Sequence, residues 1–328
     1  MLPKRVASPV FVSAKRIRDS MRFDIVMNPA SASGKAEKVF ERIRPVFESS
    51  GHEYTLHVSD RENSIGSICA RICRRAGEKR IVIIGGDGTL NEAVNGMSDL
   101  EHTLVGLVPC GTGNDLVRDL DLPKDPVSIA ELIVQGSVRH TSDIGEIAAV
   151  IDGQTVTRSF VISTDIGFGA ATCEYVSKSK IKPLLNKAGL GKLCYLIEAV
   201  RVCFREKRAD VRVTGDEGTT VYRGCICAMV MNHRFEGGGF NFAPSADPND
   251  GQFDLCISSG LSKPQFMFIL PTAYLGMHTG FRGIATGRAR ELRLDATRPV
   301  YLHTDGEVLG RTRAVRIRLS AHKLRLMM

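Results

Sequence analysis

The segment Ile81–Asn91, IVIIGGDGTLN, constrains the fold of this chain more than any other. Four apolar residues precede three glycines, which surround a single carboxylate, Asp87. An apolar β-branched run of this kind predicts a buried strand, and the glycines let a backbone loop approach a ligand closely. Thr89 and Glu92 have the spacing of a capping box, so we expect a helix to begin there and point its free N–H groups at whatever the loop holds.

Such a loop suits phosphate, because it combines close backbone approach with the positive end of a helix. A carboxylate at position 87 would repel a bare phosphate, but it could hold a Mg²⁺ ion that bridges to one. Taken alone, the motif is also compatible with a glycine turn between a strand and a helix in which Asp87 serves as a cap.

A second segment of the same construction follows. Thr103–Val108 predicts another buried strand, and Pro109–Asp115 is another glycine loop, with Thr112 and Asp115 again at capping-box spacing. Two such units in series are much less expected by chance than one. Familiar alternatives fail: Gly34-Lys35 lacks the other residues of a P-loop, and neither Gly111 nor Gly167 begins a complete dinucleotide fingerprint.

Composition narrows the class of partner. The net charge of +8 favours anionic partners, but no basic run is interleaved with aromatic residues and the chain has no Trp, so nucleic acid is not expected. An anionic membrane surface fits better, since Lys and Arg near such a surface are attracted to it. The alternative is that the charge is spread over an ordinary surface.

Nine scattered cysteines indicate free thiols in a reducing cytosol. The longest apolar stretches, such as Phe266–Met277, contain polar residues and Pro271, and fall short of the roughly 20 apolar residues of a membrane span. We therefore expect a cytoplasmic protein, peripheral at the membrane surface. The oligomeric state stays open, with a homodimer as one option.

The pattern of elements divides the chain near residue 142. Residues 1–20 read as a flexible basic arm, residues 21–142 as an α/β domain, and residues 143–328 as a β-rich domain whose last residues could pack back on the first. Strands and helices alternate in the first domain, which predicts a three-layer fold around an open, mostly parallel sheet. Short strands with glycine turns in the second predict an antiparallel β-sandwich, interrupted by helices near 187–204 and 263–276. Besides the two glycine-loop units, the first domain is predicted to have strands at 22–27 and 54–58 and helices at 35–48, 64–76 and 126–135. The predicted strands of the second domain are 159–163, 209–214, 221–231, 252–258, 289–294, 300–303 and 315–319.

These motifs resemble those of the diacylglycerol kinase catalytic-domain family, which includes bacterial lipid kinases, sphingosine kinases and ceramide kinases. More distantly the chain looks like the NAD kinases. The resemblance runs from about Phe23 almost to the C-terminus, and the order and approximate spacing of its motifs are specific. They are Asn28-Pro29 with Gly34-Lys35, GGDGT at 85–89, GTGND at 111–115, SDIG at 142–145, GFGA at 167–170, GGG at 237–239, PSA at 244–246 with Asp250-Gly251, and DGE at 305–307.

The resemblance implies an ATP- and Mg²⁺-dependent lipid kinase with its active site in the cleft between the domains. Lys35 is the candidate cation for phosphate, although it could be a solvated lysine in a first helical turn. Asn114 and Thr112 would hydrogen-bond the nucleotide through amide and hydroxyl groups. The full set of residues expected to bind the nucleotide is Asn28, Lys35, Ser59, Gly85, Gly86, Asp87, Gly88, Thr89, Asn91, Gly111, Thr112 and Asn114.

Catalysis requires a group to accept the proton of the attacking hydroxyl. In the family pattern Glu307 matches this general base, and Asp143 matches an acidic residue that lines the cleft and assists the metal or orients Glu307. A solvated glutamate in a hairpin turn and a capping aspartate are the respective structural alternatives. We thus predict Glu307, Asp143 and Asp87 as catalytic residues.

Two metal sites are implied. Asp87 would hold the nucleotide Mg²⁺, and Asp250, with the backbone carbonyls of Asp247 and Gln252, resembles a second, structural Mg²⁺ site of bacterial members. Oxygen ligands on a short loop suit a hard cation. A plain Asp-Gly turn is the alternative.

One residue departs from the pattern. Many members have an asparagine where this chain has Asp165, so the head-group pocket could differ. The GTGND form favours diacylglycerol or a related acyl lipid as acceptor, with a sphingoid base or ceramide as runner-up. A non-catalytic lipid- or nucleotide-binding protein is the rival class, but it would have no need to retain Asp87, Asn114 and Glu307 together.

Overall fold

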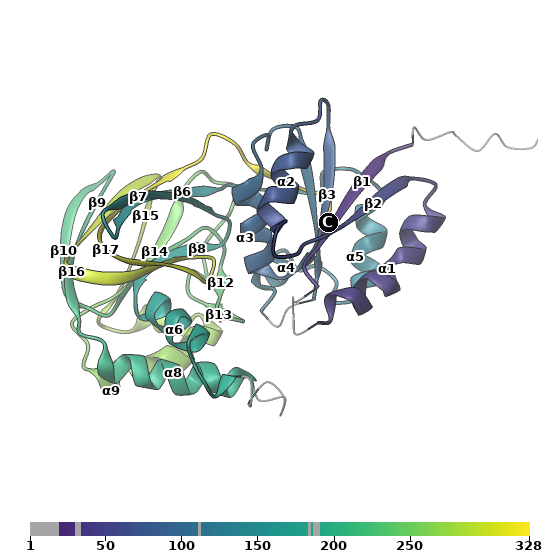
Figure 1. The fold of residues 1–328 in the computed structure, drawn as a ribbon. Coiled ribbons are helices and arrows are strands. Elements are labelled where there is room, and N and C mark those ends of the chain that lie inside the picture. Colours follow the sequence, from purple (N-terminus) through teal and green to yellow (C-terminus); the bar gives the residue numbers. More distant parts are fainter. Residues whose placement is uncertain (1–19, 30–33, 111–112, 183–184, 186–190) are drawn as a thin grey trace, which may run out of the picture.

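The computed structural model describes residues 20–29, 34–110, 113–182, 185 and 191–328. Two sheets dominate it, and they lie side by side in Figure 1, with the second sheet to the left of the first. A separate two-stranded hairpin, β12 (Phe235–Glu236) and β13 (Phe240–Asn241), completes the set of strands described.

The first sheet has six strands in the order β2-β1-β3-β4-β18-β5. All neighbouring strands are parallel except β5, which pairs antiparallel with β18. Strands β3 and β4 are buried along almost their whole length, as their apolar sequences predict. The strands are β1 (Arg22–Met27), β2 (Glu53–Val58), β3 (Lys79–Gly85), β4 (Thr103–Pro109), β5 (His140–Ser142) and β18 (Leu324–Leu326).

Helices cover both faces of this sheet (Figure 1). Helix α1 (Ala36–Ser49) packs against α5 (Pro126–Ile133), and helix α2 (Ile65–Cys73) packs against α3 (Asp87–Gly96). The short helix α4 (Asp115–Asp119) follows the second glycine loop. The prediction of a three-layer α/β fold around an open, mostly parallel sheet is confirmed.

The second sheet is antiparallel throughout and has ten strands. Its core includes Phe160 and Phe253, whose rings lie 5.4 Å apart. The predicted antiparallel β-sandwich is thereby confirmed. Its strands are β6 (Gly145–Ile151), β7 (Gln154–Phe160), β8 (Ser163–Gly167), β9 (Ala209–Gly215), β10 (Gly218–Cys225), β11 (Cys227–Met231), β14 (Phe253–Ser258), β15 (Ile284–Ala289), β16 (Glu291–Thr304) and β17 (Glu307–Leu319).

Helices α6 (Phe168–Ser177), α8 (Gly191–Arg205) and α9 (Lys263–Ile269) lie beside this sheet, at the bottom of Figure 1. The helical segment expected over 263–276 is present but changes type: after Ile269 the chain continues as the 3-10 helix η2 (Leu270–Leu275), followed by η3 (Met277–Gly280). Pro271 has no N–H to donate, which ends the α-helical hydrogen-bond pattern here.

Other boundaries also differ from the sequence prediction. The expected strands 289–294 and 300–303 are one long strand, β16, with a register shift between Asp295 and Val300. The expected strand 221–231 is two, β10 and β11. Helix α6 was not predicted, because its sequence after Gly167 reads as a glycine turn.

The chain crosses back to the first sheet at its end. Strand β18 pairs parallel with β4 and antiparallel with β5, and the amide of Met327 donates to the Val105 carbonyl at 2.9 Å. The final methionine is fully buried in the first core. The two sheets are thus linked both after Ser142 and again by β18.

Helices α2 and α3 touch at two glycines. A Cβ added at Gly96 would lie 2.1 Å from the carbonyl oxygen of Gly66 and 2.5 Å from its Cα. Because backbone atoms cannot move aside as a flexible side chain can, this contact fixes how closely α3 approaches α2, and therefore where the first glycine loop lies.

We expect Gly96→Ala to lower the free energy of unfolding by about 1–3 kcal/mol, since added volume here forces the two helices apart. Urea denaturation followed by circular dichroism measures this loss. Gly280→Ala is the matched control, because a Cβ there meets nothing within 4 Å. Equal stability of the two variants would contradict the close packing of α2 and α3.

Candidate active site

The two glycine loops lie next to each other at one edge of the first sheet. Strands β3 and β4 are parallel neighbours, with Gly85 opposite Pro109, and the Cys110 amide donates to the Gly85 carbonyl at 2.9 Å. Carboxyl ends of adjacent parallel strands are where ligands of open α/β sheets bind. Gly111 and Thr112 lie outside the described residues.

Asp87 connects the two loops. Its Oδ2 accepts the amide of Asp115 at 2.8 Å, and its Oδ1 accepts the amide of Leu116 at 3.4 Å. The carboxylate therefore caps helix α4 instead of lying free in its own loop. Burial, together with the nearby Asp115 and Asp305 carboxylates, raises the pKa of Asp87 to about 7, against the lowering effect of the Asp115 and Leu116 amides.

The capping boxes expected at the two loops are wrong. Helix α3 begins at Asp87, two residues earlier than predicted, and its N-cap residue Gly86 has no side chain with which to cap it. Helix α4 begins at Asp115 with Asn114 as N-cap, but Asn114 makes no side-chain capping bond. The glycines let the chain turn directly into α3, and the carboxylate of Asp87 takes over the capping of α4.

Three other predicted nucleotide ligands approach the same edge. Asn28 follows β1, and the Ser59 amide donates to the Met27 carbonyl at 2.9 Å, so the ends of β1 and β2 are joined. Lys35 is the exposed N-cap residue of α1. Burial raises the pKa of Cys110 at the second loop, and the charge of Lys35 acts to lower it.

Asn114 has the left-handed backbone conformation, with φ of 48° and ψ of 49°. Asn tolerates this conformation better than most other residues, which suits it to the sharp turn between loop and helix.

The second domain contributes the turn Asp305-Gly306-Glu307 between β16 and β17. The Asp305 carboxylate accepts the backbone amides of Val161, Ile162 and Ser163 at 2.7 to 2.9 Å. Burial raises the pKa of Asp305, and these amides work against that rise. The carboxylate thus ties the hairpin turn to the segment between β7 and β8.

One side chain joins this turn to the first domain. Asn91, on helix α3 directly after the first glycine loop, donates from Nδ2 to Asp305 Oδ2 at 2.7 Å and to the Ser159 carbonyl at 2.9 Å. Asn91 is buried, and the two partners lie 214 residues apart in the chain. This hydrogen bond places the DGE turn against helix α3, a few residues after the first glycine loop.

Glu307 begins β17 and has an exposed side chain. Its Oε1 lies 3.5 Å from Nη2 of Arg158 on β7. At this distance the contact is a loose surface ion pair, so the carboxylate can turn toward a substrate at little cost.

Asp143 lies elsewhere. It is buried, its Oδ2 accepts the Gly251 amide at 2.9 Å, and its Oδ1 lies 2.9 Å from Nζ of Lys323. These contacts hold the loop of residues 247–252 against the strand that ends the first domain. The described contacts of Asp143 include neither Asp87 nor Glu307.

The 247–252 loop is closed by its own side chains. Asp250 Oδ1 accepts the Gln252 amide at 3.0 Å, Asp247 Oδ1 accepts the Asn249 amide at 3.0 Å, and Asp250 Oδ2 lies 2.8 Å from Nη2 of Arg288. A cation bound by Asp250 would compete with that guanidinium. Within the part of the chain that the structure describes, no three acidic, His or Cys side chains are grouped so as to hold a metal ion.

Sequence reasoning missed a second junction between the domains. His233 Nδ1 lies 2.7 Å from Asp119 Oδ2, and its Nε2 lies 2.9 Å from Ser142 Oγ. The order Ser-His-Asp is that of a hydrolase triad, but all three side chains are buried and Asn232 also donates to Ser142 Oγ. The chain of contacts joins the domains and offers no nucleophile to solvent; nothing in the spacing of these residues signals it.

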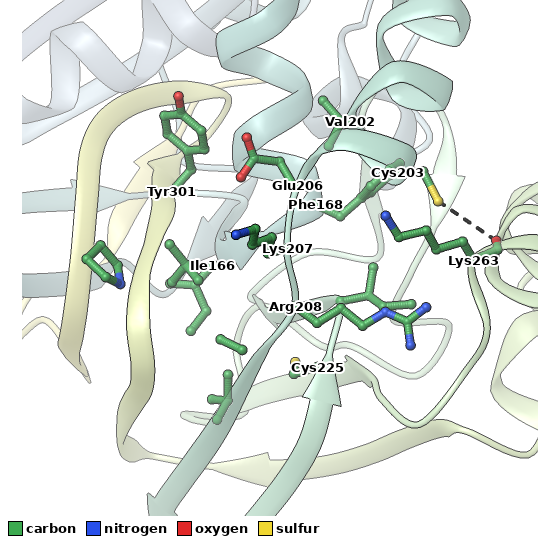
Figure 2. A pocket seen from close by; sticks show the side chains of 16 residues that line it. Ile166, Phe168, Val202, Cys203, Glu206, Lys207, Arg208, Cys225, Lys263 and Tyr301 are labelled. Carbon is green, nitrogen blue, oxygen red and sulfur yellow. Dashed lines mark hydrogen bonds between the residues drawn. The ribbon is translucent and has the colours of Figure 1, made fainter.

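The pocket in Figure 2 lies in the second domain, away from the glycine loops, between the end of α8 and strands β8 and β16. Apolar side chains such as Ile166 and Val202 line it, with Lys207, Arg208 and Lys263 around them. Its cavity is about 40 Å³, which is room for a water molecule but not for an acyl chain. We therefore assign it no substrate.

The arrangement defines a class of protein: a phosphotransferase with a glycine-loop α/β domain facing a β-sandwich domain. The model of the diacylglycerol kinase catalytic domain matches residues 22–147, and that of the YegS C-terminal NAD kinase beta sandwich-like domain matches residues 165–328. The chain therefore belongs to the diacylglycerol kinase family of lipid kinases and is an enzyme of that class.

Relatives match over most of their length. The diacylglycerol kinase of Bacillus subtilis (strain 168) is 27% identical over 291 residues, which cover 88% of this chain and 90% of that protein. A diacylglycerol kinase of Staphylococcus epidermidis is 27% identical over 312 residues, covering 92% and 90%.

Solved structures show the same fold. A diacylglycerol kinase structure from Bacillus anthracis str. Sterne has a TM-score of 0.68 at 19% identity and covers 94% of this chain and 97% of that one. An NAD kinase from Archaeoglobus fulgidus in complex with ATP has a TM-score of 0.50 at 12% identity, covering 94% of each chain. The more distant resemblance to NAD kinases is thus visible in the fold.

The contact between Asn91 and Asp305 can be tested by two substitutions. Asn91→Ala removes a hydrogen bond to a carboxylate, so we expect the free energy of unfolding to fall by roughly 1.5–3 kcal/mol. Asn91→Asp sets a second carboxylate against Asp305 and should cost more at pH 7. Denaturant titration at several pH values measures both.

The excess loss in Asn91→Asp should shrink as the pH falls. Repulsion in the folded state raises the pKa of the new carboxyl group above its unfolded value, so the penalty is present above that pKa and disappears once the group is protonated. If Asn91→Asp is as stable as Asn91→Ala at neutral pH, residue 91 does not face the Asp305 carboxylate.

Proposed function

We propose that this enzyme transfers the γ-phosphoryl group of ATP to a hydroxyl of diacylglycerol or a related acyl lipid, with Mg²⁺, between its two domains. The observation that carries the proposal is the hydrogen bond from Asn91 to Asp305, because it brings the phosphate-type loop and the turn bearing a candidate base into one site. A sphingoid base or ceramide is the alternative acceptor.

The nucleotide is assigned to the edge of the first sheet. Gly86, the N-cap residue of helix α3, provides no side-chain cap, so the positive end of the helix faces the loop, and Lys35 supplies a cation whose charge acts on Cys110. Asn28, Ser59, Thr89 and Asn114 border the same edge. Phosphoryl transfer needs mainly such positioning and charge stabilisation.

Asp87 is the carboxylate that we assign to Mg²⁺, and its two oxygens already accept the amides of Asp115 and Leu116. A partly desolvated carboxylate with two further carboxylates nearby, those of Asp115 and Asp305, is stabilised by a hard cation. When bound, the ion would neutralise charge on the phosphates. The loop of Asp247, Asp250 and Gln252 is a weaker candidate for a second ion, because Arg288 already meets the Asp250 charge.

Glu307 is the proposed general base. Its carboxylate would accept the hydroxyl proton while the hydroxyl oxygen forms its bond to the γ-phosphorus and the bond to the leaving ADP breaks. The loose contact with Arg158 leaves Glu307 free to turn. Asp143 would act indirectly, by holding the 247–252 loop.

An assay with radiolabelled ATP tests the acceptor. Diacylglycerol, monoacylglycerol, sphingosine, ceramide, phosphatidylglycerol and NAD are offered separately, with and without EDTA. We expect labelled product with diacylglycerol or monoacylglycerol, and none in EDTA. Preference for sphingosine or ceramide would select the alternative acceptor, and labelling of NAD alone would contradict the proposal.

Glu307→Gln keeps the size of the side chain but cannot take up a proton. We expect lipid phosphorylation to fall by at least ~10²-fold, while ATP affinity is retained because the nucleotide is assigned to the first domain. Turnover and ATP binding, measured by calorimetry, are the readouts. Glu291→Gln, an exposed glutamate on β16 paired with Arg316, is the matched control and should stay near wild type.

Normal lipid phosphorylation by Glu307→Gln, or joint loss of ATP binding and turnover, would show that Glu307 is not the base.

A kinase that acts on an acyl lipid must reach its substrate at a membrane, and we propose that helix α8 offers a surface for binding an anionic one. Leu193, Leu196, Val200 and Phe204 recur at spacings of three and four residues and are 40% to 58% exposed, so they form one apolar stripe. In the described part of the chain no helix is long and apolar enough to cross a bilayer.

Neighbouring segments extend this surface. Phe268 of α9 is 74% exposed and Leu275 of η2 is 76% exposed, and α9 packs against α8 at the bottom of Figure 1. The exposed basic residues Arg205 and Lys207 adjoin the stripe. An exposed apolar stripe bordered by cations suits a bilayer with anionic head groups.

We expect binding to liposomes to rise with the fraction of anionic lipid and to fall with salt, because exposed charges are screened beyond ~8 Å at physiological ionic strength. Leu196→Gln with Phe268→Gln should weaken binding in a sedimentation assay. Val150→Gln, at an equally exposed apolar site on β6, is the control and should bind as wild type. Equal binding to neutral and anionic vesicles at low salt would rule out the charge contribution.

A further inference from the structure

A buried group of three ionisable side chains lies behind the DGE turn. His303 on β16 stands opposite Asp165 on β8 in the antiparallel register. Its Nε2 lies 3.2 Å from Asp165 Oδ1 and 3.0 Å from Oε1 of Glu236, the last residue of β12. Neither His303 nor Asp165 is exposed by more than 1%.

The other ring nitrogen of His303 holds the turn itself. The Gly306 amide donates to Nδ1 at 3.0 Å. Only an unprotonated ring nitrogen can accept an N–H, so the ring proton is assigned to Nε2, where it faces the two carboxylates. Glu236 and Asp165 therefore select the tautomer that binds Gly306.

Asp165 is suited to this task because it meets donors on every side. Besides facing His303 Nε2, it accepts the amides of Gly169 at 3.0 Å and Ala170 at 2.7 Å. An asparagine, with one accepting oxygen and an NH₂ group, would turn a donor against one of these donors. An aspartate at position 165 therefore suits a site in which His303 and two backbone amides all face it.

The cluster also reaches the nucleotide side of the site. Glu236 is followed by three glycines with positive φ, and the amide of Gly238 donates to Asp115 Oδ2 at 2.8 Å. Asp115 begins helix α4 after the second glycine loop. One segment therefore contacts both that loop and the ring that holds the turn.

We propose that His303 is a positioning residue for phosphoryl transfer: its Nδ1 fixes the Gly306 amide, and with it the backbone that carries Glu307, while Glu236 and Asp165 fix the ring. The inference rests on the proposed function, in which Glu307 is the base. His303 itself is not a catalytic residue, because it is fully buried, its Nδ1 accepts the Gly306 amide, and its Nε2 faces Asp165 and Glu236.

Two substitutions separate the roles of the two ring nitrogens. In His303→Asn the side-chain oxygen takes the place of Nδ1 and can still accept the Gly306 amide. In His303→Gln the amide reaches toward Asp165 and Glu236, but Gly306 loses its acceptor. We expect the Asn variant to keep kcat within about threefold of wild type and the Gln variant to lose at least tenfold, both with unchanged KM for ATP.

Hydrogen exchange at the Gly306 amide supplies a readout that does not depend on activity. Its protection should survive in His303→Asn and fall at least tenfold in His303→Gln. His278→Asn and His278→Gln form the control pair, since His278 is also buried in the second domain but contacts Cys256 and the Phe242 carbonyl. These controls should lower Tm without changing exchange at Gly306.

Equal loss of kcat and of Gly306 protection in both His303 variants, in proportion to their Tm, would overturn the inference and leave His303 as a packing residue. If the wild-type protein labels no lipid, the proposed function is refuted instead. The comparison of Gly306 amide protection between His303→Asn and His303→Gln would still decide whether His303 holds the turn.

Discussion

The Asp305 carboxylate is a contact that joins the DGE turn, the β7–β8 segment and helix α3. It receives three backbone amides from its own domain and the Asn91 side chain from the other. A carboxylate shielded from water is costly unless its oxygens are hydrogen-bonded, so the turn, the β7–β8 segment and helix α3 stabilise one another. Together with the contacts of His233 and with strand β18, these hydrogen bonds hold the two domains against each other.

Carboxylate side chains connect several pairs of segments that are distant in the sequence. Asp87 ties the first glycine loop to helix α4, Asp119 ties α4 to His233, and Asp143 ties the end of β5 to the 247–252 loop. Each accepts hydrogen bonds from a segment distant in the sequence. Acceptor-only side chains are effective at such joints because backbone N–H groups and cations offer them partners from any direction.

The sequence could predict the elements whose signal is local. The apolar runs before Gly85 and Pro109 specify buried parallel strands, and the change to short strands after Ser142 specifies a second, antiparallel sheet. Helix starts near the glycines were mispredicted, because Asp87 caps α4 across space and no capping box at Thr89 is needed. Helix α6 was missed since its glycines also suit a turn.

What the sequence by itself determined is the set of motifs, their order and the two-sheet fold, because hydrophobic period, glycine placement and charge act between near neighbours. Which distant motifs meet was decided only by the tertiary structure. Nothing in the spacing indicates that Asn91 binds Asp305 or that Gly306 is held by a histidine facing Asp165 and Glu236. Those contacts depend on strand register and domain packing, which bring together residues that the linear sequence separates.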